Sequence, residues 1–97
     1  MRQKDRKRCQ AALTTALHMA GGRYEDLGDA VARAIGRPEP FSKESVRKWF
    51  KYGVSAERAV HIEMAFPEQV HRTELRPDLF VFELPERLKN RDSISQG

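Results

Sequence analysis

Residues 24–51 read YEDLGDAVARAIGRPEPFSKESVRKWFK, and the two apolar stripes within this stretch decide the fold. In its first part, apolar side chains recur at the spacing of a helix that packs one face on a core. They are Leu27, Ala30, Val31, Ala34 and Ile35. This spacing predicts a helix over residues 24–35, ended by Gly36, because glycine accepts the left-handed conformation that closes helices. The two prolines of residues 37–41 then predict a loop.

The second part of the stretch predicts a helix that starts at Ser42 and ends near Lys51. Serine is a favoured N-cap, because its hydroxyl accepts a hydrogen bond from the first helical turn. The apolar stripe of this helix is made of Val46, Trp49 and Phe50. We expect the stripe to pack on the alanine-rich preceding helix, whose small side chains allow a close crossing. The outward face then carries Lys43, Glu44, Arg47 and Lys48.

Further helices are predicted on both sides of this pair. A helix over residues 8–20 has one apolar face and is stopped by two glycines at residues 21 and 22. Its apolar face consists of Leu13, Ala16, Leu17 and Ala20. On the other side, a helix begins at Ser55 and is ended by Pro67. Its inward face consists of Ala59, Ile62, Ala65 and Phe66.

The remaining sequence predicts little further structure. Residues 73–76 fit one more helical turn before Pro77, and residues 80–84 fit either a short strand or a hydrophobic arm. The expected fold is all-α, a small bundle of four to five short helices with a flexible C-terminal tail. We expect a basic N-terminal arm at residues 1–8, a helical domain at residues 9–80 and a partly disordered C-terminal arm at residues 81–97.

Composition limits the possible classes of protein. A chain of 97 residues is one domain, and its single cysteine, Cys9, cannot form an intramolecular disulfide. A reducing, cytoplasmic location is therefore the default. We expect no membrane segment, because no run approaches the roughly 18 apolar residues of a membrane span. Residues 11–20 also fit an amphipathic helix better than a signal peptide.

The net charge of +4 is concentrated in two places, residues 1–8 and residues 37–51. Such clusters indicate a polyanion partner. The alternative, that these are ordinary solvated side chains, is equally compatible with a charge of this size. Residues 1–8 have the same two interpretations, as an arm that follows a nucleic-acid backbone or as a solvated chain end.

Two short helices joined by a turn, the second basic and capped by serine, have the sequence outline of a helix-turn-helix. An α-helix fits the major groove of B-DNA, where lysine and arginine bond guanine and glutamate accepts from cytosine. Candidate base-reading residues are therefore Lys43, Glu44, Arg47 and Lys48. Candidate contacts to the DNA backbone are Ser42, Ser45, Arg37 and Lys51. The alternative is an exposed, charged helix face without a ligand.

Four segments in this order resemble the Cro/YdaS-type phage regulators. They are AVARAIG at residues 30–36, SKESVRKW at residues 42–49, VSAERA with Ile62-Glu63 at residues 54–63, and VHRTELRPDLF at residues 70–80. The resemblance covers residues 10–80 and implies a λ-repressor-like bundle of about five short helices. It further implies that the helix from Ser42 reads DNA, often as a homodimer on paired half-sites, and represses or switches prophage genes. Some members are described as antitoxins.

The chain departs from this family at one place. Residues 37–41 make the turn before Ser42 longer than the tight turn that is usual there. The longer turn is expected to affect the docking angle of the following helix. It also offers new contacts, with Arg37 reaching a phosphate and Phe41 packing beneath the helix.

No catalytic group, cofactor site or metal site is expected. The three histidines are far apart in sequence, none is near Cys9 at metal-ligand spacing, and no catalytic triad or phosphate loop is present. The main alternative function is a protein-binding module or antitoxin that uses the apolar residues Phe80, Phe82 and Leu84 to contact a partner or a second copy. A third possibility is a transcriptional activator that contacts polymerase through Glu57 and Glu63.

Overall fold

The computed structural model describes residues 3–80, and within them the chain forms five helices and no strand. The helices are α1 (Gln3–Ala20), α2 (Tyr24–Ala34), α3 (Lys43–Tyr52), α4 (Ala56–Ala65) and α5 (Arg72–Leu75). The predicted all-α bundle is confirmed. None of these helices is long and apolar enough to cross a membrane.

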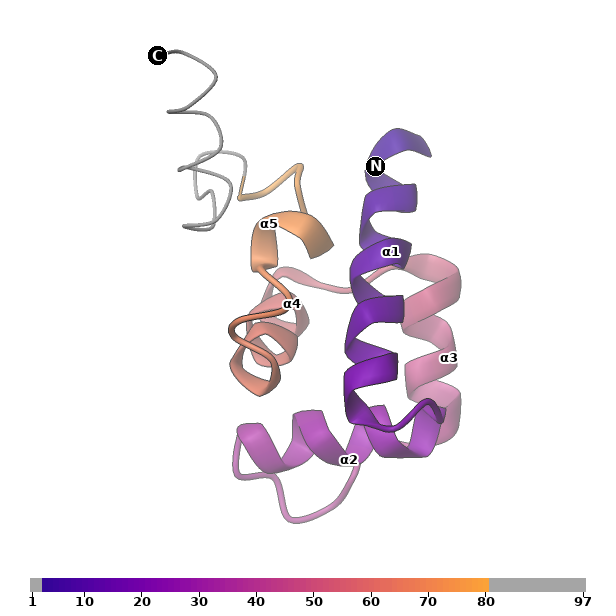
Figure 1. Ribbon diagram of the computed structural model, residues 1–97, viewed down its shortest axis with the longest axis vertical. Helices are drawn as coiled ribbons and strands as arrows, with labels where there is room; N and C mark the ends of the chain where they lie inside the picture. The colour runs from indigo at the N-terminus through magenta and orange to yellow at the C-terminus, as the bar shows by residue number, and fades with distance from the viewer. Residues whose placement is uncertain (1–2, 81–97) are drawn as a thin grey trace.

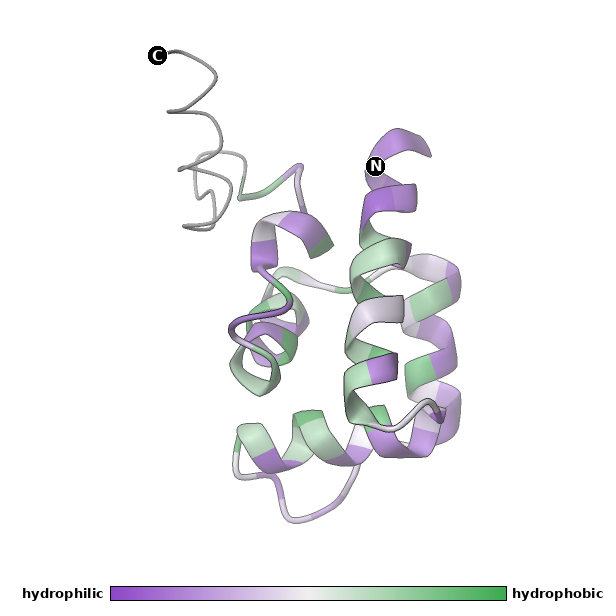
Figure 2. Cartoon of the chain, in the orientation of Figure 1, coloured by the Kyte–Doolittle hydropathy of each residue, from purple (hydrophilic) through white to green (hydrophobic). Residues whose placement is uncertain are grey.

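α1 is the longest helix, and α2, α3 and α5 pack directly on it. α3 lies alongside α1, α2 crosses one end of both, and α4 packs on α2 and α5 (Figure 1). The apolar side of each helix faces this interior (Figure 2). The largest fully buried side chains come from all five helices and the segments between them: Leu13, Leu27, Ile62, Leu75, Val31, Val46, Val70 and Cys9.

The predicted helix ends are largely confirmed. Ser42 and Ser55 are the N-caps of α3 and α4, and each hydroxyl accepts a backbone N–H at 3.1 Å. The glycines predicted to stop α1 and α2 all have positive φ, and so does Gly53, the C-cap of α3. Caps of this kind satisfy backbone groups that a helix end leaves without partners.

The predicted start of the first helix is wrong. α1 begins at Gln3 rather than near residue 8, so residues 3–8 are its first turns and not an extended arm. The reason is that the lysines, arginines and glutamine of this segment are good helix formers. Arg6 also ties the segment to α3 by donating to the backbone carbonyl of Lys51 at 2.8 Å.

The predicted inner face of α2 is correct only in part. Leu27 and Val31 are fully buried, but Gly28 and Ala32 are buried as well, while Ala30 and Ala34 are half-buried. The buried face of α2 is therefore rotated about the helix axis relative to the predicted face. Helical spacing shows that a helix has an apolar face, but α3 and α4 both pack on α2 and together decide which side is covered.

Beyond α4, the chain folds back on its own core. The predicted turn at residues 73–76 is present as α5, which carries the buried residues Thr73 and Leu75. Phe80 is half-buried and packs on this core, with the guanidinium of Arg72 5.6 Å from its ring centroid. It is therefore not a free apolar arm. Phe82 and Leu84 lie outside the described residues.

Candidate nucleic-acid interface

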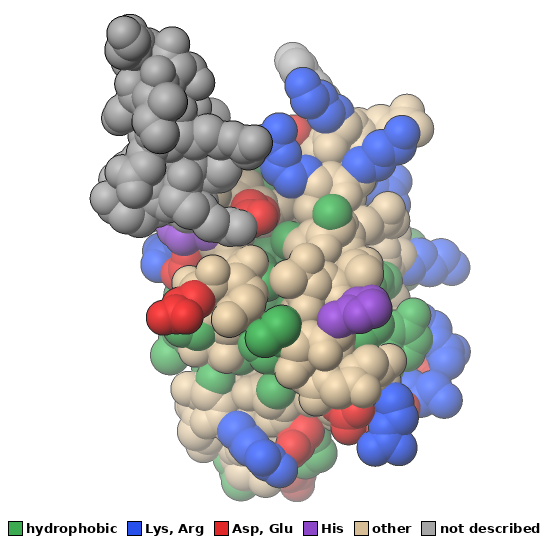
Figure 3. Space-filling view, in the orientation of Figure 1, with side chains coloured by type: hydrophobic (Ala, Val, Ile, Leu, Met, Phe, Trp, Pro, Cys, Tyr) green, Lys and Arg blue, Asp and Glu red, His purple; other side chains and the backbone are tan. Residues whose placement is uncertain are grey.

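The outward face of α3 carries the residues that the sequence predicts there. Lys43, Glu44, Arg47 and Lys48 are exposed, whereas Val46 and Trp49 on the other face are buried. Among residues 3–80, the ion pair on this face joins Arg47 and Glu44 and is long, at 3.5 Å. Basic side chains gather along the outer side of α3 and over the first turns of α1 (Figure 3). α3 thus presents long, exposed polar side chains on a well-anchored helix.

The N-terminal end of α3 is fixed by its two serines. The hydroxyl of Ser42 accepts the backbone N–H of Ser45 and donates to the Ser45 hydroxyl, both at 3.1 Å. The Ser42 hydroxyl is therefore used for capping, although the residue itself is exposed. A contact from Ser42 to DNA would have to share this oxygen or come from the backbone.

α2 comes close to the start of α3 at Gly28, a position that the sequence pattern does not single out. The carbonyl of Gly28 accepts the backbone N–H of Phe41 at 3.3 Å. A Cβ atom at residue 28 would overlap the carbonyl oxygen of Phe41 and lie 3.3 Å from Val46 Cγ2. Only glycine allows this approach, so the absence of a side chain at residue 28 sets the distance between the two helices.

The long turn at residues 37–41 is anchored by Phe41, as the sequence suggests. Phe41 is buried and its ring meets the Trp49 ring edge-on, with 5.5 Å between centroids. Two guanidinium groups also contact this ring: those of Arg37 at 4.0 Å and Arg58 at 4.1 Å from its centroid. Phe41 therefore holds the longer turn against α3 and α4.

Arg58 was not among the predicted site residues. It lies in the first turn of α4, where it approaches both Phe41 and Trp49 and donates to His61 Nδ1 at 3.1 Å. Burial lowers the pKa of Arg58 from its ordinary value, and the positive charge of Arg37 lowers it further. No sequence pattern links residues 41 and 58, because their contact depends on how α4 packs on the α2–α3 pair.

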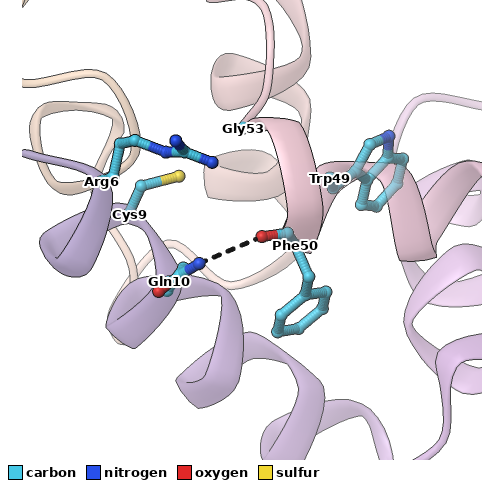
Figure 4. Close-up of a pocket in the computed structure, with 6 residues that line it drawn as sticks. All are labelled: Arg6, Cys9, Gln10, Trp49, Phe50 and Gly53. Atoms are coloured by element: carbon cyan, nitrogen blue, oxygen red, sulfur yellow. Dashed lines mark hydrogen bonds between the residues drawn. The ribbon is translucent and has the colours of Figure 1, made fainter. Parts of the chain in front are cut away.

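The C-terminal end of α3 is held by α1. Arg6 donates to the carbonyl of Lys51, and Gln10 donates to the carbonyl of Phe50 at 3.3 Å (Figure 4). A cation at this end also complements the negative end of the helix dipole. Arg6 thus joins the first basic cluster to the second, while the exposed side chain of Lys51 lies beside the Tyr52 ring.

Cys9 lines the narrow crevice between α1 and the end of α3 (Figure 4). Burial raises the pKa of its thiol, with a smaller opposing effect from a hydrogen bond with the Val54 backbone. A neutral, buried thiol is a packing group rather than a nucleophile. Within residues 3–80, no three His, Cys, Asp or Glu side chains are placed to hold a metal ion.

Glu63 does not lie on an exposed acidic surface. Its carboxylate accepts from the Arg72 side chain at 2.8 Å and from the Arg72 backbone at 3.1 Å, and lies 3.2 Å from His71 Nε2. Burial alone raises the pKa of Glu63, but the hydrogen bonds from Arg72 outweigh it and lower that pKa below its ordinary value. Of the two acids considered for polymerase contact, only Glu57 is exposed.

Comparison with known proteins gives one result. The model of the family described as bacterial toxin YdaS matches residues 13–83. The chain belongs to this family. The match includes the whole α2–α3 pair and the 70–80 segment, in agreement with the Cro/YdaS resemblance. No curated protein and no solved structure matches the chain.

Proposed function

We propose that this YdaS-family protein binds double-stranded DNA sequence-specifically, with α3 as the helix that enters the major groove. One observation carries the proposal: α3 is fixed at both ends and along its inner face, while its outer face is exposed and polar. A rigid helix with free polar side chains is what direct reading of base edges requires.

The roles of the α3 side chains follow from their chemistry. Arg47, Lys43 and Lys48 suit the acceptor atoms of guanine, and Glu44 suits the amino group of cytosine. We propose that Arg37, Lys51 and the two serines Ser42 and Ser45 position the helix on the phosphate backbone. The first turns of α1 add a fixed basic surface rather than a flexible arm.

The biological activity that we propose is transcriptional regulation in the cytoplasm, by a homodimer that occludes a promoter. Two copies are proposed because dimers read paired half-sites about one helical turn apart. No enzymatic activity, cofactor or membrane association is part of the proposal.

The family description favours one alternative. The family is described as a bacterial toxin, so the chain can instead be a protein-binding module or antitoxin with a protein partner. Packing of Phe80 on the protein's own core leaves less apolar surface for such a partner. We therefore place DNA binding first.

The test reverses charge on α3 without touching its core. We expect Arg47→Glu with Lys48→Glu to abolish selective duplex binding and leave the fold intact, because both side chains are exposed. Binding is measured by selecting duplexes from a random pool, with affinities at two salt concentrations. The control, Arg23→Glu with Arg33→Glu, makes the same change in charge at exposed side chains outside α3. Tight, selective binding by the α3 double mutant would contradict the role of this helix.

A further inference from the structure

Arg37 and Arg58, which we call the arginine pair, bring two positive charges to one aromatic ring. Arg37 comes from the long turn and Arg58 from α4, and each guanidinium carbon lies about 4 Å from the centroid of Phe41. The two charges are therefore within roughly twice that distance of each other. Residues from two separate segments converge here although like charges repel.

Among residues 3–80, no carboxylate forms an ion pair with either member of the arginine pair. Other arginines of the bundle have such a partner: Arg33 lies 2.7 Å from Asp29, and Arg76 lies 2.7 Å from Asp78. Burial lowers the pKa of Arg58 and the charge of Arg37 lowers it further, while Glu57 has a smaller opposing effect. A phosphate bound at either guanidinium group would reduce the repulsion within the pair.

The chemistry of the pair favours a phosphate group. A guanidinium is weakly hydrated and offers parallel N–H donors that match the oxygens of a phosphate. Stacking on Phe41 restricts both side chains before a ligand arrives, so less conformational freedom is lost on binding. Arg37 remains exposed and Arg58 is half-exposed, so an anion can reach both.

The arginine pair also lies where the DNA backbone would run if α3 entered the major groove. Phe41 directly precedes Ser42, the N-cap of α3, so the pair flanks the N-terminal end of the helix proposed to read DNA. The phosphate backbone borders the major groove on both sides of such a helix. Side chains at this position would contact the DNA backbone, whereas base reading is assigned to the outer face of α3.

We propose that Arg37 and Arg58 together bind phosphate groups of the DNA backbone and so fix the N-terminal end of α3 in the groove. The proposal rests on the DNA binding proposed above. It gives the long turn at residues 37–41 a function, because Phe41 and Arg37 both belong to it. It also adds α4 to the DNA-binding surface.

The experiment measures duplex affinity across a series of salt concentrations for Arg37→Met and Arg58→Met in the full chain. Each neutralised phosphate contributes about 0.9 to the slope of log K against log salt. We expect each variant to reduce that slope by about 0.9 and to weaken binding to all duplex sequences by a similar factor. Arg58→Lys keeps the charge and should keep the slope. Arg33→Met, which removes an arginine paired with Asp29, is the matched control.

The outcomes separate this proposal from the one on which it rests. If the wild-type protein binds no duplex, the proposed function fails and this inference fails with it. If the wild type binds but Arg37→Met and Arg58→Met keep its salt slope, only the role of the arginine pair is overturned. Circular dichroism checks folding, and should Arg58→Met not fold, the exposed Arg37 variant decides by the same slope.

Discussion

Two regions of the bundle are held by different interactions. The first, the α2–α3 joint, is the contact of Gly28 with Phe41 and Val46. The second, the α4–α5 end, is the group of ion pairs around Glu63 and Arg76. At the joint, Gly28 lets the backbone of Phe41 come into contact with α2, and apolar side chains fill the remaining space. At the other end, Glu63 holds Arg72 and His71, and Arg76 bridges Asp78 and the carbonyl of Val54. One region depends on shape and the other on charge.

This difference shows how the protein can position one helix strictly and still close its bundle with few residues. Close packing is sensitive to a single added methyl group but insensitive to pH. Hydrogen-bonded ion pairs hold short segments such as α5, which is too short to be stable alone. They lose their strength when the acid is protonated. The following predictions use these two sensitivities.

The largest effect is expected for Gly28→Ala at the joint. The new Cβ would overlap the carbonyl oxygen of Phe41, so the backbone of the long turn or of α2 must move. We expect a loss of about 3 kcal/mol in the free energy of unfolding, measured by urea denaturation, because overpacked sites cost 1–3 kcal/mol. Since the shift moves α3, duplex binding should also weaken.

Gly22→Ala is the matched control, because residue 22 has open space around it but a positive φ of 94°. Its cost should be limited to backbone strain, about 1 kcal/mol, with duplex binding unchanged. Equal effects of the two variants on both measurements would show that the joint is not set by the close approach at Gly28.

At the charged end, Glu63→Gln should lower the free energy of unfolding by about 2 kcal/mol at neutral pH, because it leaves Arg72 partly uncompensated. The pKa of Glu63 is lowered in the folded state, so its stabilisation is present above the ordinary glutamate value of 4.5. It is lost as the pH falls through the lower folded pKa. The difference between wild type and variant should therefore shrink in acid.

Denaturation curves at several pH values from neutral to below 4.5 measure this difference. Glu57→Gln changes the same residue type at an exposed position on the same helix and should cost less than Glu63→Gln at neutral pH. A Glu63→Gln difference that stays constant into acid would mean that the carboxylate charge does not hold this end of the bundle.

The sequence predicts the joint better than the charged end, and the reason is the range of the interactions. The caps and stripe of α3 depend on residues within one or two turns, so Ser42, Val46 and Trp49 could be placed correctly. The α1 start was missed although its lysines, arginines and glutamine are good helix formers, which is a local signal. Only the bond from Arg6 to Lys51 that holds this start on α3 spans 45 residues. Gly28 and Arg58 have their roles only through partners that tertiary packing brings to them.

The burial of Glu63 likewise depends on tertiary packing that the sequence does not reveal. In the sequence, this residue resembles Glu57, since both are acids on one predicted helix. Their exposures differ, with side chains 14% and 83% exposed respectively, because Arg72 folds back over one of them. Helical spacing places an acid on a helix but does not reveal which acid a later segment will cover.

The smallest effect is expected when the same N-cap is removed from each of two helices. Ser42→Ala and Ser55→Ala each remove one hydroxyl that accepts a backbone N–H at 3.1 Å. Loss of a serine cap costs about 1 kcal/mol, so thermal unfolding should show similar destabilisation for both. Ser42→Asn, which retains a capping side chain, should recover most of the loss at α3.

Measurements of duplex affinity should then distinguish the two cap variants. Ser42→Ala loosens the first turn of α3, where Lys43 and Glu44 are carried, so it should weaken selective binding more than its stability loss alone explains. Ser55→Ala loosens the first turn of α4, which carries Arg58. Because Arg58 is proposed to contact only phosphates, this variant should weaken binding to all duplex sequences alike. If both variants lose selectivity equally, the division between a base-reading α3 and a backbone-contacting α4 is wrong.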